Sequence, residues 1–295
     1  MNIKKITFFV MTKKGYEVLK EVESQFPSSI DLIISIKDKN VKIDFFDKIK
    51  TFAKKKSIKF YNYKDFKFKI ENSYIFAISW KYLITNFKNS QLIVFHDSLL
   101  PKYKGFNPLV SALINGEKKI GVTAIKGNND YDSGDIIKQK KIIIKYPIKI
   151  QQAIDSIIPL YKDLVINIIK TIKKNKLLYS KKQNNNNATY SLWKDEEDYL
   201  INWNDSSQNI KRFIDASGYP YKGASTFFEN KKIRINNAEI MKEKIIVNRI
   251  PGKVFKSDED GYLVVCKKGI IKISDIYYDK NKKKFNYNKI KIKFV

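Results

Sequence analysis

Apolar runs alternate with amphipathic stretches from residue 6 to residue 174. Short runs such as Ile6 to Val10 have the length of buried strands, and Asp44 to Lys56 places its apolar side chains on one helical face. Strands that alternate with helices predict an α/β fold, with a Rossmann-like, mostly parallel sheet and helices on both faces. The predicted strands are 6–10, 31–36, 59–63, 74–79, 92–95, 121–126 and 136–144, and the predicted helices are 14–25, 44–56, 109–115 and 150–174.

The pattern changes after a polar, asparagine-rich tract from Lys181 to Thr189, which has no periodicity and is typical of an interdomain linker. Beyond it, short β-rich runs separated by turn signals predict a small, OB-like β-barrel. The chain is therefore expected to divide into a first domain over 1–180, a linker over 181–205 and a C-terminal β-barrel domain over 206–295. The expected elements of the last part are a helix at 206–216 and strands at 224–228, 232–235, 253–256, 262–266, 270–276 and 290–295.

The 295 residues carry a formal net charge of +28, which would suit a nucleic-acid partner. Nearly all of this charge is lysine, however, and the only arginines are Arg212, Arg234 and Arg249. Because proteins that read bases or clamp phosphates depend on the bidentate geometry of arginine, we interpret the lysine content as a chain-wide compositional bias. The positive field would still attract a phosphorylated small molecule.

No apolar run reaches membrane-spanning length, so no membrane partner is expected. The single cysteine, Cys266, cannot form an internal disulfide, and with one histidine no Cys/His metal site can be built. We therefore expect a protein of the reducing cytoplasm that holds no metal ion.

The only histidine, His96, follows the apolar run of the fifth predicted strand and precedes Pro101 and Gly105. A buried strand that ends in this way delivers a side chain to the mouth of a sheet, where open α/β folds place their ligands. Because imidazole exchanges protons near neutral pH, His96 is a candidate catalytic group, and a structural histidine is the alternative. After the first predicted strand, Met11 to Gly15 lacks the GxGxxG spacing, so a dinucleotide site is not predicted.

Two blocks of residues carry more specific information. The first is His96-Asp97-Ser98-Leu99-Leu100-Pro101 with Gly105, and the second is Gly121-Val122-Thr123 followed by Asp132-Ser133-Gly134-Asp135-Ile136. In this order they resemble the folate-dependent formyltransferase family, which includes methionyl-tRNA formyltransferase and nucleotide-sugar N-formyltransferases. Leu200 to Trp203 and Pro251 to Val254 resemble elements of the family's second domain, so the resemblance covers most of the chain.

The resemblance implies a formyltransferase that moves a formyl group from 10-formyltetrahydrofolate to a primary amine. His96 would stabilise the developing oxyanion or move the proton, and Asp132 would orient its imidazole. One position departs from the family pattern, because Val94 stands where the family has an asparagine two residues before the histidine. Loss of such an oxyanion donor typically slows a reaction about a hundred- to a thousandfold. Asp97, Ser79 or a water would then have to replace it, or the protein is catalytically impaired.

The resemblance also implies binding residues. The backbone of Ser79, Trp80 and Lys81 would pair with the pterin edge of the folate. A loop with Asn128, Asn129, Asp130 and Tyr131 would lie on the other side of the pterin. The residues expected to contact the acceptor are Lys102, Tyr103, Lys104 and Phe106. Solvated loop charge is the alternative for the first three.

The acceptor expected from the sequence is a small amino sugar linked to a nucleoside diphosphate. The tRNA-acting members of the family carry a long basic loop after the second strand, whereas the corresponding link here, Lys37 to Ile43, is short. They also have a Gly-Thr-x-x-Phe turn after the first strand, which this chain lacks. Formylation of methionyl-tRNA and a non-enzymatic folate- or nucleotide-binding role, suggested by Val94, are the alternatives. A homodimer is compatible with the sequence, which does not specify the oligomeric state.

Overall fold

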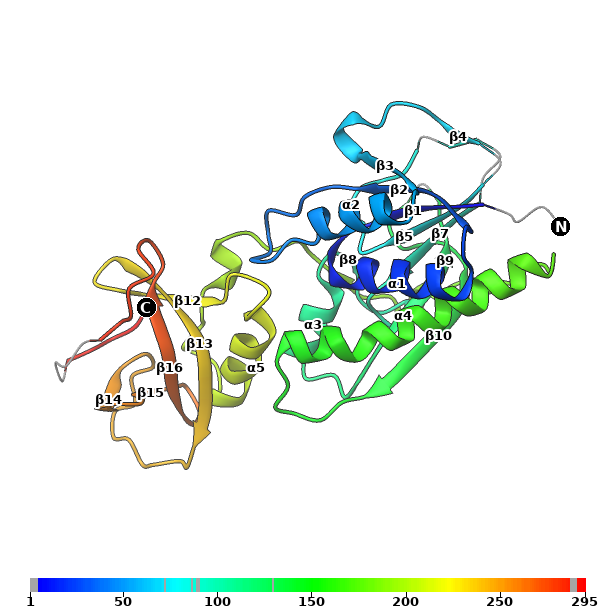
Figure 1. Ribbon diagram of the computed structural model, residues 1–295. Coiled ribbons are helices and arrows are strands. Elements are labelled where there is room, and N and C mark those ends of the chain that lie inside the picture. Colours follow the sequence, from blue (N-terminus) through cyan, green and yellow to red (C-terminus); the bar gives the residue numbers. More distant parts are fainter. Residues whose placement is uncertain (1–4, 72, 86, 89–90, 129, 287–290) are drawn as a thin grey trace.

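A seven-stranded sheet forms the first part of the computed structural model, which describes residues 5–71, 73–85, 87–88, 91–128, 130–286 and 291–295 (Figure 1). Its strand order is β10-β9-β7-β5-β1-β2-β3. The strands from β7 to β3 run parallel and β9 is antiparallel to both of its neighbours, so the predicted mostly parallel sheet is confirmed. The bounds are β1 (Ile6–Val10), β2 (Ile30–Ser35), β3 (Lys59–Asn62), β5 (Tyr74–Ile78), β7 (Gln91–His96), β9 (Lys119–Lys126) and β10 (Ile136–Ile143).

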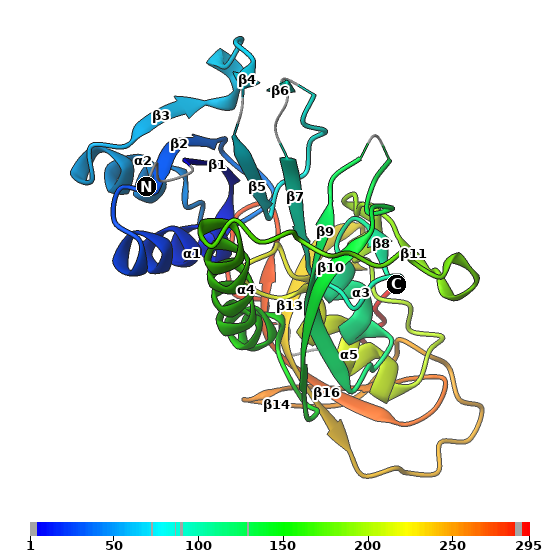
Figure 2. The same cartoon turned by 90° about the vertical axis from the view of Figure 1, so that its right-hand side faces the viewer.

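Four helices pack on one face of this sheet: α1 (Thr12–Gln25), α2 (Phe46–Lys55), α3 (Pro108–Ile114) and α4 (Ile150–Lys173). Alternate strand residues such as Phe8 and Phe76 share a core with Leu19 and Ile49 from these helices. Figures 1 and 2 show α1 and α4 lying side by side. Among the described residues, no helix has both the length and the apolar character needed to cross a membrane.

The covering of the opposite face differs from the prediction of helices on both faces. Phe9 and Ile75 point to this side and pack with Phe66 and Trp80. The segments that cover them are the 3₁₀ turn η1 (Tyr63–Asp65) and the paired strands β4 (Ile70–Glu71) and β6 (Phe87–Lys88). The connections between β3, β5 and β7 are short and rich in aromatic residues, so a few large rings bury this face without a helix.

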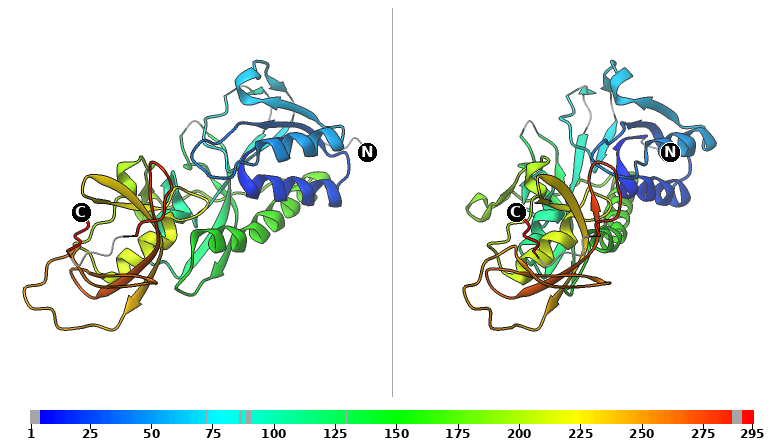
Figure 3. Two further views of the ribbon diagram at one scale, coloured as in Figure 1. Left: turned by 60° about the vertical axis from the view of Figure 1, so that its left-hand side comes forward. Right: turned by 90° about the vertical axis from the view of Figure 1, so that its left-hand side faces the viewer.

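The C-terminal part is an antiparallel sheet in the order β12-β13-β16-β15-β14, with α5 packed on α3 of the first part (Figures 1 and 3). Val295 exchanges backbone hydrogen bonds with Phe227 of β12, and the Phe294 N–H donates to the Gly252 carbonyl just before β14. These bonds join the two edge strands and close the predicted barrel. Ile290, the first residue of the last predicted strand, lies outside the described residues. The bounds are α5 (Ser207–Ser217), β12 (Ala224–Phe228), β13 (Lys231–Met241), β14 (Val254–Asp258), β15 (Gly261–Val265) and β16 (Ile270–Tyr278).

The polar segment between the two sheets is ordered along the first one. Its residues 181–191, which we call the strap, include the turn η2 (Asn185–Asn187) and the strand β11 (Tyr190–Ser191), which pairs in parallel with β8 (Lys104–Gly105). The Gln183 side-chain amide donates to the carbonyl oxygens of Asp132 and Gly134, both at 2.7 Å. The segment predicted as a linker therefore follows the loops that flank His96. After the strap comes a further 3₁₀ turn, η3 (Glu197–Tyr199).

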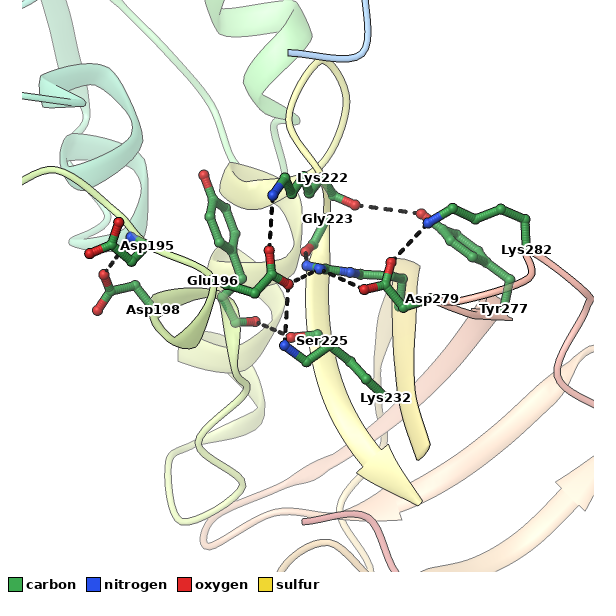
Figure 4. A network of polar contacts seen from close by, with 12 residues as sticks. Asp195, Glu196, Asp198, Lys222, Gly223, Ser225, Lys232, Tyr277, Asp279 and Lys282 are labelled. Carbon is green, nitrogen blue, oxygen red and sulfur yellow. Dashed lines mark hydrogen bonds and ion pairs between the residues drawn. The ribbon is translucent and has the colours of Figure 1, made fainter. Parts of the chain in front are cut away.

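A buried arginine fixes the end of this linker to the barrel, in the network of polar contacts shown in Figure 4. Arg234 of β13 is 1% exposed, and its Nη1 donates to the Gly223 carbonyl at 2.9 Å. Its Nη2 bonds to the carboxylate of Glu196 and, at 3.1 Å, to that of Asp279. Burial would raise the pKa of Asp279, but Arg234 and Lys282 outweigh this effect and lower the pKa from 3.8 to about 2.

We expect acid to weaken the fold through Asp279. A carboxyl group whose pKa is lowered by folding adds stability above its unfolded pKa and loses it as the pH falls through the folded value. For Asp279 this window runs from about pH 4 to about pH 2, and the loss is about 2 kcal/mol. Urea unfolding across this range measures the loss, which Asp279→Asn should reduce and the control Asp260→Asn, at an exposed carboxylate, should not. A wild-type profile as flat as that of the Asp279 variant would contradict the assignment.

Candidate active site

His96 lies at a cavity formed at the carboxyl ends of β1, β5 and β7. The cavity has a volume of about 280 Å³, near the lower end of the roughly 300–1,000 Å³ typical of small-molecule sites. His96 is the last residue of β7, and Val94, on the same face of this strand, lines the cavity beside Ala77 of β5. The histidine thus occupies the mouth of the sheet, the place that the strand pattern indicated.

Both ring nitrogens of His96 face oxygen atoms. Nδ1 lies 3.2 Å from Oδ1 of Asp132, and Nε2 lies 2.7 Å from the carbonyl oxygen of Tyr103. The side chains of His96 and Asp132 are only 8% and 10% exposed, so water competes little for these contacts. Because a carbonyl oxygen only accepts, Nε2 is the nitrogen that donates to Tyr103, and Nδ1 is left facing the Asp132 carboxylate. The structure brings the two residues of the expected catalytic pair into contact.

The backbone around Asp132 is held so that its carboxylate faces His96. Asp132 has a left-handed φ of +51°, and its Oδ2 accepts the backbone N–H of Gly105 at 2.9 Å. Two residues later the chain passes so close to β9 that a Cβ at Gly134 would lie 1.7 Å from the carbonyl oxygen of Lys126. This close approach explains the glycine of the Asp-Ser-Gly motif.

Asp97, one of the groups considered as a replacement for the missing asparagine, belongs to a second charged network. Its two carboxylate oxygens bond to the Lys14 ammonium group and to the Tyr161 hydroxyl. Burial would raise the pKa of Asp97, but Lys14 and Tyr161 outweigh it and lower the pKa, while burial beside Asp97 raises the pKa of Tyr161. Asp97 is therefore ionised and has no proton to donate. Within the described ranges, no cluster of three His, Cys, Asp or Glu side chains suits a metal ion.

Lys14 and Tyr161 could not be recognised as site residues from the sequence. Lys14 stands in the first turn of α1, and Tyr161 in the long helix α4, where an apolar face hides it among ordinary core residues. Both nevertheless line the cavity beside His96. Such contacts join distant parts of the chain, so they become visible only once the fold is known.

One side of the cavity is the segment predicted to bind the pterin, and Ser79, Trp80 and Lys81 all line it. Ser79 follows β5 with a left-handed φ of +52°. The Trp80 ring packs edge-on against Phe9 at a centroid distance of 5.0 Å, and the Lys81 ammonium group lies 3.1 Å from Oδ1 of Asp38. Both side chains are thus held in place by the fold.

Three buried polar atoms of this cavity are unsatisfied. Within the parts of the chain that the structure describes, Thr12 Oγ1, Ser79 Oγ and Trp80 Nε1 have no hydrogen-bond partner, and all three residues line the cavity. Buried polar groups in folded proteins almost always have partners, so each exception needs an explanation. Their concentration in one cavity indicates a site for a polar ligand.

The loop before Asp132 also lines the cavity, through Asn128, Asp130 and Tyr131. Asn129, which the sequence groups with them, lies outside the described residues. The Asn128 amide donates to the Ser133 hydroxyl at 2.7 Å, so this loop is braced internally.

Only one of the four residues expected to contact the acceptor lines the cavity. Phe106 lines the cavity, whereas Lys102, Tyr103 and Lys104 are not among its lining residues. Lys102 and the Tyr103 hydroxyl point to Glu117, at 3.4 and 3.0 Å, and Lys104 is buried. Tyr103 contributes to the site through its carbonyl oxygen, on His96, instead of through its ring.

An aromatic group stands at the rim of the cavity, and the sequence predicted two of its members, Phe106 and Tyr131, but not Trp193. Trp193 is 61% exposed and Tyr131 is 49% exposed. Both contact the Phe106 ring, at centroid distances of 6.2 Å and 5.7 Å, and Lys194 lines the same side. The signal that could have found Trp193 is a large aromatic residue directly before the charged run 194–198.

Two family models match the chain and together cover more than half of it: Formyl transferase over residues 73–157, and Formyl transferase, C-terminal domain, over residues 194–290. The methionyl-tRNA formyltransferase of Caldanaerobacter subterraneus is 31% identical over 188 residues, which are 64% of this chain and 59% of that protein. The methionyl-tRNA formyltransferase of Finegoldia magna is 31% identical over 208 residues, 70% of this chain and 64% of that protein. The chain thus spans about three-fifths of the length of these curated relatives.

Solved structures are similar over more of the chain. WlaRD, a sugar 3N-formyl transferase crystallised with dTDP and 5-N-formyl-THF, has a TM-score of 0.69 and 23% identity and covers 93% of this chain and 98% of its own. An N-formyltransferase from Helicobacter canadensis, in complex with folinic acid and dTDP-3-aminofucose, has a TM-score of 0.68 and 20% identity, covering 92% and 99%. HypX from Aquifex aeolicus, in complex with tetrahydrofolic acid, has a TM-score of 0.62 and 16% identity, covering 99% and 51%. At these identities the similarity shows the fold.

Proposed function

The chain belongs to the formyl transferase family, and from that premise we propose that it transfers a formyl group from 10-formyltetrahydrofolate to a primary amine. The observation that carries this proposal is the contact between His96 and Asp132 at a cavity on the carboxyl edge of the sheet. The unsatisfied polar atoms of Ser79 and Trp80 fit a formylated folate, whose ring and formyl group present several donors and acceptors. Three structural neighbours solved with folates lend support.

In this reaction the folate supplies the formyl group, and the residues of the chain organise charge around it. His96 is held between Tyr103 and Asp132, and in its protonated form it stabilises the negative charge that grows on the formyl oxygen as the amine adds. Asp132 keeps the ring in that form and orientation. A bond forms between the amine and the formyl carbon, the bond from that carbon to N10 breaks, and a proton passes from the amine to N10.

We propose a nucleotide-linked amino sugar as the acceptor. The link between β2 and α2 is tied down, with the Lys42 backbone N–H bonded to the Pro220 carbonyl at 2.9 Å, so it forms no free basic loop. The rings of Tyr131 and Trp193 offer faces on which a nucleobase can stack, and Lys194 offers a cation for a phosphate. Two structural neighbours were solved with dTDP or dTDP-3-aminofucose.

Formylation of methionyl-tRNA is the second candidate function. The relatives of 31% identity are methionyl-tRNA formyltransferases. The net charge of +28 would also favour a polyanion. This candidate predicts binding that weakens steeply as salt is added, because each neutralised phosphate releases condensed counterions.

A formyl-transfer assay with matched acceptors separates the candidates. The acceptors are dTDP-linked 3-amino and 4-amino sugars, the same amino sugars without the nucleotide, and methionyl-tRNA, each at low and high salt. We expect turnover with a nucleotide-linked amino sugar, a large loss without the nucleotide, and little effect of salt. Turnover confined to methionyl-tRNA would select the second candidate. Folate binding without transfer to any acceptor would leave the non-enzymatic role.

We further propose that residues 1–180 form the catalytic domain, 181–205 the linker and 206–295 the barrel domain. Two hydrophobic clusters support this division: one is built almost wholly from residues 6–172, the other from residues 201–294. A reducing cytoplasmic setting suits Cys266, which is a free thiol and whose pKa burial raises to about 12.

A further inference from the structure

The formyl oxygen needs a hydrogen-bond donor that His96 does not supply in this structure. Its Nε2 lies 2.7 Å from the Tyr103 carbonyl oxygen and its Nδ1 lies 3.2 Å from the Asp132 carboxylate, so both ring nitrogens are already turned to protein oxygen atoms. Val94, on the same face of β7, carries no polar atom, and the Asp97 carboxylate has no proton. Reactions that build charge on a carbonyl oxygen are fastest when a preorganised donor is aimed at it. The donor is therefore to be sought elsewhere in the cavity.

Three buried side-chain donors of the cavity have no partner in the described residues: the hydroxyls of Thr12 and Ser79 and the indole N–H of Trp80. Leaving a buried donor unpaired is unfavourable, so such groups persist where a ligand completes them. A donor to the formyl oxygen would have to lie beside His96.

The pairing and order of the strands place Ser79 nearer to His96 than Thr12. In the parallel pair β5–β7, Ile78 lies opposite Phe95, so Ser79, the first residue after β5, follows directly beside the end of β7, where His96 stands, and both residues line the cavity. The sheet order β7-β5-β1 places Thr12, which follows β1, one strand farther from His96.

Trp80 is less suitable because its ring is packed among other rings. It lies against Phe9, Tyr63 and Tyr82, with centroid distances between 5.0 and 5.7 Å. Ser79 has a left-handed φ of +52°, and Thr12 has one of +62°. Strained backbone is often found at functional sites, so it marks both positions. Only the place of Ser79 beside the end of β7 distinguishes it from Thr12.

We propose that the Ser79 hydroxyl donates a hydrogen bond to the formyl oxygen of the donor substrate, beside the positive charge of His96. This inference rests on the proposed formyl transfer. It makes Ser79 a catalytic residue through its side chain and gives this chain a substitute for the polar side chain that Val94 lacks. The bond strengthens as negative charge grows on the oxygen, so it lowers the barrier more than it tightens binding.

The test compares two stable folate analogues, 10-formyl-5,8-dideazafolate and 5,8-dideazafolate, which differ only in the formyl group. We expect the wild-type protein to bind the formylated probe more tightly, and Ser79→Gly to lose about 5- to 10-fold of that preference while binding the second probe as before. Glycine removes the hydroxyl and also relieves the backbone strain, so the variant is expected to fold. In the transfer assay, kcat should fall about a hundredfold.

Two further variants sharpen the result. Thr12→Val removes the competing hydroxyl at similar volume and should leave the preference unchanged. Val94→Asn, on the same face of β7 as His96, offers an amide donor and should restore kcat in the Ser79→Gly background. A Ser79→Gly protein that keeps the formyl preference, or a wild type that binds both probes equally, overturns this inference and leaves formyl transfer standing. A wild type that binds neither probe contradicts the proposed function itself.

Discussion

Replacing His96 with alanine is expected to slow formyl transfer about a hundred- to a thousandfold. The substitution removes the positive charge beside the formyl oxygen and leaves the Asp132 carboxylate, 10% exposed, without its partner. Folate binding should change far less, because the pterin contacts are expected on the side of Ser79 to Lys81. The measurement is kcat for the preferred acceptor together with the Kd of 5,8-dideazafolate.

Two further variants serve as a test of the partner residue and as a control. Asp132→Asn keeps the shape of the side chain and can still accept the Gly105 N–H, but it cannot hold the charged ring. A loss of similar size is expected, since residues that act as a unit have non-additive effects. Asp163→Asn alters a half-exposed carboxylate of α4, paired with Lys140, and should keep kcat within about twofold. A His96→Ala protein with wild-type turnover would remove the proposed mechanism.

The second large effect concerns stability. Lys14→Met is expected to lower the free energy of unfolding by about 3–5 kcal/mol, because it leaves the largely buried Asp97 carboxylate, 16% exposed, without its cation. The Tyr161 hydroxyl alone cannot neutralise that charge. Urea denaturation at neutral pH measures the loss.

The neighbouring lysine provides a matched control. Lys13 forms a surface pair with Asp155 and has a side chain that is 41% exposed, against 9% for Lys14. Lys13→Met should therefore change stability by less than about 1 kcal/mol. The double variant Lys14→Met/Asp97→Asn should recover at least part of the loss, since no charge is then buried unpaired. Equal losses of unfolding free energy in the two single lysine variants would show that the Lys14–Asp97 pair stabilises the fold no more than the surface pair does.

Much of the fold could be read from periodicity. The strands of the first sheet and the helices α1, α2, α3 and α4 lie within a few residues of their predicted bounds, because apolar spacing reports directly on which face is buried. Pairing between strands is harder to read. β13 continues to Met241 although the sequence turns polar at Asn236 and Asn237, since its backbone hydrogen bonds to β16 do not depend on side-chain polarity.

The candidate site was predictable where residues lie in short motifs. His96 and Asp132 stand in two such motifs, and the structure joins them. Contacts set by tertiary packing were not predictable in this way. Lys104 looked like a loop cation, yet the pairing of β8 with β11 buries it and turns its ammonium group toward Asn185. Lys14 carried no signal because its partner Asp97 lies 83 positions further along the chain.

The strap also determines where the chain can be divided. Thr189 forms hydrogen bonds with the backbone of Tyr103 and Lys104, and the Gln183 side chain donates to the carbonyl of Asp132. The strap therefore braces both loops that contact the His96 ring. A recombinant fragment ending at residue 180 would retain every strand of the large sheet but would lose the strap. Cleavage by a protease between residues 181 and 191 would likewise lower the transfer activity, although this segment contains neither His96 nor Asp132.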